Sequence, residues 1–166
     1  LATLHRPSNV DDPVQLAALL SALGQVGERM PVIFPVHPRT RSRLGVLEMP
    51  ASIVLTEPMS YLDFLGAEAK AAVVITDSGG VQEETTALGV PCVTARSSTE
   101  RPITVTEGTN RLAGANASNV LQVTLEVLDN PPSPRRPALW DGNAALRCAD
   151  AVEEMLGSAD WPRPTE

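Results

Sequence analysis

Residues 71–88 read AAVVITDSGGVQEETTAL, and this stretch decides the fold. Its first five residues are apolar, as in a short β-strand that is buried on both faces. Polar residues and two glycines then form a turn, and a helical pattern follows until Gly89 and Pro91 end it. A buried strand, a tight turn and a helix form the repeating unit of a parallel α/β sheet.

The same alternation extends in both directions along the chain. We predict strands at 1–4, 32–36, 52–55, 71–75, 92–94 and 110–112. We predict helices at 39–47, 60–69, 81–88, 116–128 and 141–156, and one that starts at Pro13 behind the N-cap Asp12 and is closed by Gly24 and Gly27. This pattern indicates a Rossmann-like parallel sheet flanked by helices over residues 1–157, with 158–166 as a frayed tail.

The helix that starts at Pro13 has the clearest pattern of burial. Its apolar residues recur at helical spacing and form one stripe, which consists of Leu16, Leu19, Leu20, Leu23 and Val26. We therefore expect this stripe to pack against the sheet.

The composition is that of a globular protein without a nucleic-acid partner. Of the 166 residues, 43% are hydrophobic, 20% are charged and 3% are aromatic, which predicts an aliphatic core. A formal net charge of −7 argues against a nucleic-acid backbone, which needs clustered basic residues, but allows a small phosphorylated ligand. No apolar run is long enough to cross a bilayer, so we expect no membrane partner and a cytoplasmic location.

The two cysteines, Cys92 and Cys148, each lie in an apolar stretch, and we expect both to be buried free thiols. Two cysteines and two histidines without close spacing predict no metal site. The chain starts abruptly in an expected strand and without Met, so we expect it to be part of a longer protein.

Polar and basic residues follow the predicted strands. His5 follows the first strand and His37 the second, Asp77 and Ser78 follow the fourth, and a loop that includes Arg101 follows the fifth. The carboxyl ends of parallel strands meet at one edge of the sheet, where such folds bind ligands. We therefore expect these residues to share a binding site.

The turn Ser78-Gly79-Gly80 has two interpretations. Glycines let a ligand approach the backbone closely, and the N–H groups at a helix start attract an anion. A tight turn with Ser78 as an ordinary N-cap explains the same residues equally well. Glu84, one turn further on, could accept both hydroxyls of a ribose, or Glu83 and Glu84 could merely complement the helix dipole.

Each of the other candidates also has a functional and a purely structural interpretation. The two histidines could serve as acid/base groups or phosphate contacts, or as capping and packing residues. Arg101 could neutralise a diphosphate or pair with Glu100. Tyr61 or Phe64 could pack against a planar base or belong to the core.

Six motifs occur in an order found in one known family. They are Leu4-His5-Arg6, Pro35-Val36-His37-Pro38, Thr76 to Glu84, Leu88-Gly89-Val90-Pro91, Thr99 to Pro102 and Gly108 to Leu112. Together they resemble the C-terminal domain of the non-hydrolysing UDP-N-acetylglucosamine 2-epimerases from residue 1 to about residue 156. The segments from Thr76 to Glu84 and from Thr99 to Pro102 are its specific part.

The resemblance implies the UDP-binding C-terminal half of a two-domain GT-B fold. The implied activity is that of an isomerase in cytoplasmic polysaccharide biosynthesis. It interconverts UDP-GlcNAc and UDP-ManNAc by elimination and re-addition of UDP, without cofactor or metal. Further catalytic carboxylates belong to the missing N-terminal half, so we expect the chain alone to bind UDP weakly without epimerising it. We expect the full-length protein to be a homodimer.

The resemblance also assigns roles to individual positions. By motif position, Ser78, Gly79 and Gly80 would bind the phosphates, Glu84 would bind the ribose, and Phe64 would lie near the uracil. His5 and Arg101 would act in catalysis at the diphosphate and the reacting sugar, where Arg101 would also bind UDP. His37 would contact an allosteric or substrate molecule.

Three alternatives remain open from the sequence. A GT-B glycosyltransferase would share the UDP contacts but usually has a different acidic motif in this helix, and a hydrolysing epimerase would release free ManNAc. A non-enzymatic receiver or interaction module could use Asp77 as phosphoacceptor. A receiver needs an acidic pair after the first strand and a Lys after the fifth, where this chain has His5-Arg6 and Arg96.

Overall fold

The computed structural model describes residues 1–45 and 47–157. Its contacts group the chain into two compact units, Leu1–Arg136 and a second unit that begins at Pro137 and includes helix α8 (Ala144–Gly157). Each unit is described by itself below. A domain boundary at residue 157 stays a prediction, and the expected tail at 158–166 lies outside the described residues.

The first unit contains all six predicted strands; two have the predicted bounds, and the ends of the other four differ from the prediction by at most three residues. They are β1 (Ala2–Thr3), β2 (Val32–Pro35), β3 (Ile53–Thr56), β4 (Val74–Thr76), β5 (Cys92–Thr94) and β6 (Asn110–Leu112). Every pairing is parallel. Hydrogen bonds divide them into a four-stranded sheet, β1-β4-β5-β6, and a two-stranded sheet, β2-β3, because the two-residue β1 pairs its backbone with β4.

The two sheets lie next to each other. β1 contacts β2, so the spatial order of the strands reads 3-2-1-4-5-6. This is the order of a doubly wound Rossmann-like fold, whose ligands bind where the order reverses, between β1 and β4. The predicted parallel α/β architecture is therefore confirmed.

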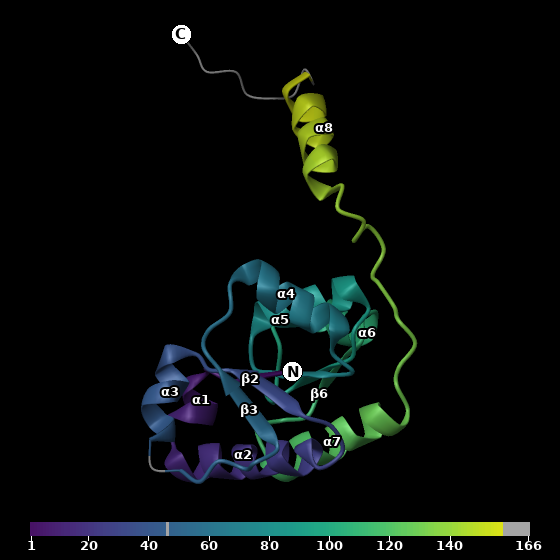
Figure 1. The fold of residues 1–166 in the computed structure, drawn as a ribbon. Helices are drawn as coiled ribbons and strands as arrows, with labels where there is room; N and C mark the ends of the chain where they lie inside the picture. The colour runs from purple at the N-terminus through teal and green to yellow at the C-terminus, as the bar shows by residue number, and fades with distance from the viewer. Residues whose placement is uncertain (46, 158–166) are drawn as a thin grey trace. The chain divides into compact units, whose positions relative to one another are not determined.

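Helices cover both faces of the strands. In Figure 1, α2 (Pro13–Gly27) and α7 (Ala117–Asp129) lie on one face, and α4 (Tyr61–Lys70) and α5 (Gly79–Leu88) lie on the other. The remaining helices of this unit are short: α1 (Pro7–Val10), α3 (Pro38–Leu44) and α6 (Pro102–Thr106). Within residues 1–45 and 47–157, no helix combines the length and apolarity that crossing a bilayer requires.

Helix α2 confirms the predicted start and stripe but not the role of Gly24. The Asp12 carboxylate accepts from the Val14 amide at 2.9 Å, and all five stripe residues are buried in the core beside Phe34. The helix continues through Gly24 to Gly27. A Cβ at Gly24 would lie 2.6 Å from the Cβ of Pro50, so this glycine allows close packing and does not end the helix.

The two cysteines differ in their surroundings. Cys92 is fully buried in β5, and burial raises the pKa of its thiol to about 12. Cys148 is exposed, so the expectation that both thiols are buried was wrong. It lies on α8, in which no residue is buried. The prediction failed because an apolar pattern alone does not show that a helix face packs against a core.

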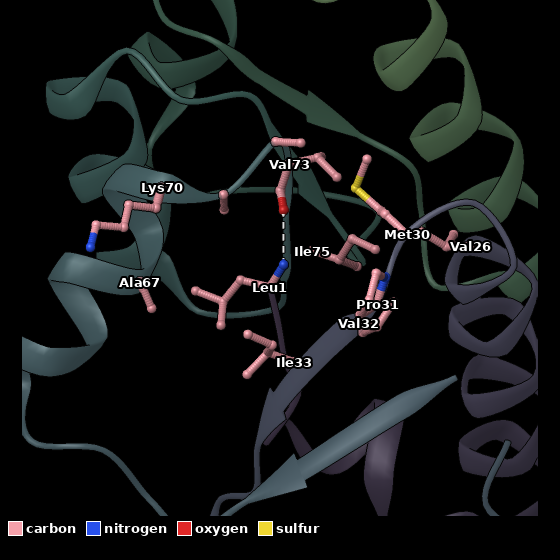
Figure 2. A pocket seen from close by; sticks show the side chains of 12 residues that line it. Leu1, Val26, Met30, Pro31, Val32, Ile33, Ala67, Lys70, Val73 and Ile75 are labelled. Atoms are coloured by element: carbon pink, nitrogen blue, oxygen red, sulfur yellow. Dashed lines mark hydrogen bonds between the residues drawn. The ribbon is translucent and has the colours of Figure 1, made fainter. Parts of the chain in front are cut away.

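An apolar cavity of about 360 Å³ lies at the starting ends of the strands (Figure 2). The backbone nitrogen of Leu1 donates to the Val73 carbonyl there at 3.1 Å. Among the described residues that line this cavity, Lys70 alone has a polar side chain. Because the lining offers few polar partners, this cavity is poorly suited to a nucleotide, and the residues after the strands lie at the opposite edge.

Candidate functional site

The candidate site lies at the carboxyl ends of β1 and β4. These strands are neighbours in register, with Thr3 opposite Thr76, so the residues that follow them emerge side by side. His5 follows β1, and Asp77 and Ser78 follow β4. The chain leaves the two strands in opposite directions along the sheet, which creates the crevice where doubly wound folds bind ligands.

Asp77 organises the residues after β1. Its fully buried carboxylate accepts from the backbone amides of His5 at 3.1 Å and Arg6 at 2.9 Å, and from Asn9 Nδ2 at 3.0 Å. His5 Nδ1 lies 3.0 Å from Asp77 Oδ1. Burial alone raises the pKa of Asp77, but the bonds from His5, Asn9 and Arg6 outweigh it and hold this pKa below 3.8.

This arrangement gives His5 a defined orientation. An ionised Asp77 acts only as an acceptor, so His5 Nδ1 carries the shared proton and Nε2 is left for a ligand. From the sequence, Asp77 was expected at the shared binding edge, and its one suggested chemical role was that of a phosphoacceptor, which needs an accessible carboxylate. The buried, fully engaged Asp77 instead positions the loop and the imidazole, a role that no local motif indicates.

The second histidine joins the first at this edge. The rings of His5 and His37 lie 5.5 Å apart at a tilt of 40°. His37 is also the N-cap of α3, where its Nδ1 accepts from the Arg39 amide at 3.2 Å. The capping interpretation of His37 is thus confirmed, and its contact with a substrate or allosteric molecule stays a prediction.

The start of α5 contains two glycines that the fold itself does not require. Ser78 is the N-cap residue, but its side chain makes no capping hydrogen bond. Gly79 and Gly80 are helical, without positive φ. In the part of the chain that the structure describes, a Cβ at Gly79 would meet no atom within 4 Å, and one at Gly80 would meet only Ser78 Oγ at 4.0 Å. A Cβ at Gly108, by contrast, would lie 2.4 Å from the Thr104 carbonyl oxygen.

Neither backbone conformation nor internal packing therefore accounts for Gly79 and Gly80. Their small size leaves space in front of the first turn of α5. The N–H groups of such a turn carry a partial positive charge, which favours a phosphate group.

Arg101 lies beside α5, with a partner that differs from the one considered from sequence. Its Nε is 2.9 Å from Glu83 Oε1, and both side chains are about two-fifths exposed. Glu100 instead binds Arg96 through two hydrogen bonds of 2.7 and 2.8 Å, which lower the pKa of Glu100 to about 2. An ion pair of Arg101 with the Glu100 carboxylate was therefore wrong, although Arg101 Nη1 donates to the Glu100 backbone carbonyl at 3.2 Å. The Arg101 side chain stays accessible at the edge of the site.

Helices α4 and α5 carry the other two predicted ligand contacts. Phe64 is half-buried and packs against Val74, Val81 and Val90, while Glu84 is half-buried on α5. A third group, Glu68, was not expected. Its carboxylate is fully buried and has no hydrogen-bond partner among the described residues. Burial together with the nearby Glu84 raises the pKa of Glu68 to about 7.

Residues 1–153 match the family described as UDP-N-acetylglucosamine 2-epimerase. The chain belongs to this family. The match covers the whole first unit and part of the second, and it includes every residue of the candidate site. It agrees with the family that the six motifs predicted.

Relatives and solved structures agree with this assignment. A UDP-N-acetylglucosamine 2-epimerase of Methanococcus maripaludis is 40% identical over 87% of this chain and 41% of its own length. A UDP-2,3-diacetamido-2,3-dideoxy-D-glucuronate 2-epimerase of Pseudomonas aeruginosa is 35% identical over 93% of this chain and 44% of its own length. The chain thus spans less than half the length of these relatives.

One solved structure is that of the Methanocaldococcus jannaschii UDP-GlcNAc 2-epimerase in complex with UDP-GlcNAc and UDP. It matches this chain with a TM-score of 0.74 and 35% identity, over 90% of this chain and 44% of its own. The chain therefore has the fold of about half of such an epimerase.

Proposed function

We propose that this chain is the UDP-binding half of a UDP-GlcNAc 2-epimerase. The observation that carries the proposal is the pair Gly79 and Gly80, which opens the first turn of α5 although neither φ nor internal packing requires glycine. Family membership supports UDP as the ligand, since the two relatives described above are both named as epimerases of UDP-sugars.

The proposed contacts follow the geometry of the strand ends. The first turn of α5 faces the diphosphate, Glu84 accepts the ribose hydroxyls, and Phe64 lies near the uracil. Arg101 reaches the diphosphate by exchanging Glu83 for phosphate oxygens. His5 faces the diphosphate and the reacting sugar with Nε2, because Asp77 occupies Nδ1.

The proposed reaction begins with elimination of UDP: the C1–O bond to the diphosphate and the C2–H bond both break, a base takes the C2 proton, and a glycal is left. UDP then adds back at C1 and a proton is delivered to the opposite face of C2, which inverts that centre. The leaving diphosphate gains negative charge, which fixed N–H dipoles and an arginine stabilise more strongly in the transition state than in the substrate. We assign further catalytic groups to the part of the relatives that this chain does not span, so the chain alone binds UDP without epimerising it. A homodimeric, cytoplasmic enzyme of polysaccharide biosynthesis fits this activity.

The identity of the sugar is a separate matter. The relative from Pseudomonas aeruginosa is named for a diacetamido-glucuronate nucleotide and is nearly as similar as the one named for UDP-GlcNAc. Both names share the UDP group and the epimerised position. A second candidate function is therefore 2-epimerisation of such a modified UDP-sugar with the same UDP contacts.

Titration of the 166-residue chain with UDP tests the proposal. We expect amide hydrogen exchange to slow across residues 76–84, and Arg101→Gln to weaken UDP binding about tenfold, since it removes a charge-assisted contact. Arg29→Gln is the matched control, because Arg29 pairs with Asp129 elsewhere on the surface. Unchanged exchange at residues 76–84 in the presence of UDP would falsify UDP binding at this turn.

A further inference from the structure

Gln82 is a fully buried side chain of α5 that lies between two parts of the candidate site. Its Nε2 donates to the Ser78 carbonyl at 3.0 Å, at the start of the same helix. Its Oε1 accepts from Thr99 Oγ1 at 2.6 Å, in the loop that leads to Arg101. A single amide therefore contacts both the turn at Ser78 and the Arg101 loop.

The connection extends to the backbone of Arg101. Thr99 Oγ1 accepts from the Arg101 amide at 2.9 Å, while Thr104 Oγ1 and the Thr104 amide donate to the Arg101 carbonyl at 2.7 and 3.0 Å. Three successive hydrogen bonds thus run from the Ser78 carbonyl through Gln82 and Thr99 to the Arg101 amide. In a buried region of low dielectric such bonds reinforce one another.

Asn110 fixes the orientation of the Gln82 amide. Asn110 Nδ2 donates to Gln82 Oε1 at 3.2 Å and to Thr104 Oγ1 at 3.0 Å, and its Oδ1 accepts from Thr94 Oγ1 at 2.7 Å. Rotating the Gln82 amide by half a turn would place donor against donor at Asn110 and acceptor against acceptor at Ser78. The hydrogen bonds from Ser78 through Gln82 and Thr99 to Arg101, called the Gln82 bridge below, are therefore all made in only one orientation of the Gln82 amide.

We propose that Gln82 is a positioning residue that holds the turn at Ser78 and the Arg101 loop at one separation, so that both reach the same diphosphate. This inference rests on the proposed function. A diphosphate is compact, and misplacing one of two groups that bind it by about 1 Å costs much of its contribution. The exposed ion pair of Arg101 with Glu83 is too weakly stabilising to fix the loop alone.

Comparison of UDP with uridine separates positioning from general support of the core. In Gln82→Met the new side chain has a similar volume, but all three hydrogen bonds of the Gln82 side-chain amide are lost. We expect it to weaken UDP binding about tenfold while uridine, which lacks phosphates, binds within about twofold of wild type. Equal losses for both ligands, or no loss for UDP, would overturn the proposal.

Thr99 provides a matched pair of variants on the other side of the bridge. Thr99→Val removes the hydroxyl and should weaken UDP binding about as much as Gln82→Met, whereas Thr99→Ser keeps the hydroxyl and should bind UDP within about twofold of wild type. The double variant Gln82→Met/Thr99→Val should lose no more than the weaker-binding single variant, because both changes break one connection. Additive losses would contradict a shared bridge.

A measurement without ligand distinguishes failure of this inference from failure of the proposed function. In Thr99→Val we expect faster amide exchange at Gly79 and Gly80, in a different segment of the chain, and in Thr99→Ser no change. If exchange at these glycines is the same in Thr99→Val and wild type, the coupling does not exist. If the coupling between Thr99 and the glycines exists but the wild-type chain does not bind UDP, the proposed function is rejected. A diphosphate is then not the ligand for which Gln82 holds the two segments in place.

Discussion

At the scale of single residues, Asp77 determines how the chain leaves β1. Asp77→Asn keeps the shape of the side chain but replaces an acceptor of four hydrogen bonds with an amide that must donate with one of its atoms. We expect the free energy of unfolding at pH 7 to fall by about 3 kcal/mol, as measured by urea denaturation. Asp150→Asn, at an exposed position of α8, should change it by less than about 0.5 kcal/mol.

The pH dependence of this effect has a definite sign. The pKa of Asp77 is below 3.8 in the folded chain, so its stabilisation is present above about pH 3.8 and is lost as the pH falls below that value. The same substitution should release the proton from His5 Nδ1, which the ¹⁵N shifts of the imidazole report. Identical imidazole shifts in wild type and Asp77→Asn would show that Asp77 does not select the tautomer of His5.

At the scale of elements, a substitution in the first turn of α5 should change fold stability and UDP affinity in opposite directions. Gly80→Ala meets no clash within the chain and improves helix propensity, so we expect it to stabilise the fold by up to about 1 kcal/mol. The same methyl group occupies the space in front of the helix and should weaken UDP binding at least about tenfold. Thermal unfolding and UDP titration measure the two effects.

Gly66→Ala in α4 is the matched control for Gly80→Ala. A Cβ at Gly66 also meets nothing within 4 Å, and the residue lies inside a helix. It should stabilise the chain by a similar amount and leave UDP affinity unchanged. If Gly80→Ala behaves like Gly66→Ala in both measurements, then the glycine at the start of α5 does not serve a ligand.

The contact between α4 and α5 should depend on pH through Glu68. With a folded pKa of about 7 against an ordinary 4.5, the folded chain holds the proton of Glu68 while the unfolded chain loses it. Stability should therefore decline as the pH rises from about 4.5 to 7, by about 3 kcal/mol in total, and then level off. Glu68→Gln should lack this decline, and the exposed Glu153→Gln should keep it. Parallel pH profiles of melting temperature for wild type and Glu68→Gln would contradict a buried, titrating carboxyl.

The local sequence pattern predicted those elements that have a long apolar repeat or two independent signals, such as an apolar stripe together with an N-cap. The stripe of α2 and its cap at Asp12 define that helix, and the run before Thr76 defines β4. Helix α6, with five residues, is shorter than two helical turns and has no readable period. The division of the strands into two sheets depends on which neighbour pairs with the two-residue β1, and that is a non-local choice.

The candidate site divides in the same way. The edge that carries His5, Ser78 and Arg101 follows from the parallel direction of the strands, which the sequence predicted together with the positions of these residues after the strands. Which groups touch there could not be predicted, because the partners are distant in the chain: the His5 amide and Asp77 are 72 residues apart, and Thr99 and Gln82 are 17 apart. An acid such as Glu68 on a mostly apolar helix face gives no signal until burial is known.

At the scale of the whole molecule, the candidate site belongs to one unit. His5, Ser78, Glu84 and Arg101 all lie within Leu1–Arg136, and no residue of α8 in the second unit is buried. The last residues of the first unit are anchored to it, since Arg135 donates to the Gly108 carbonyl at 2.9 Å. A chain that ends at Arg136 should therefore keep its fold.

We expect this shortened chain to bind UDP within about twofold of the 166-residue chain and to melt within a few degrees of it, because ligand binding and core burial both reside in the first unit. Arg135→Gln in the shortened chain provides the contrast. This substitution removes the hydrogen bond to the Gly108 carbonyl, at a point where Gly108 also packs closely against Thr104. The amides next to residue 135 should therefore exchange faster, while UDP still protects those of Gly79 and Gly80. Loss of UDP binding on removal of residues 137–166 would mean that the second unit contributes to the site.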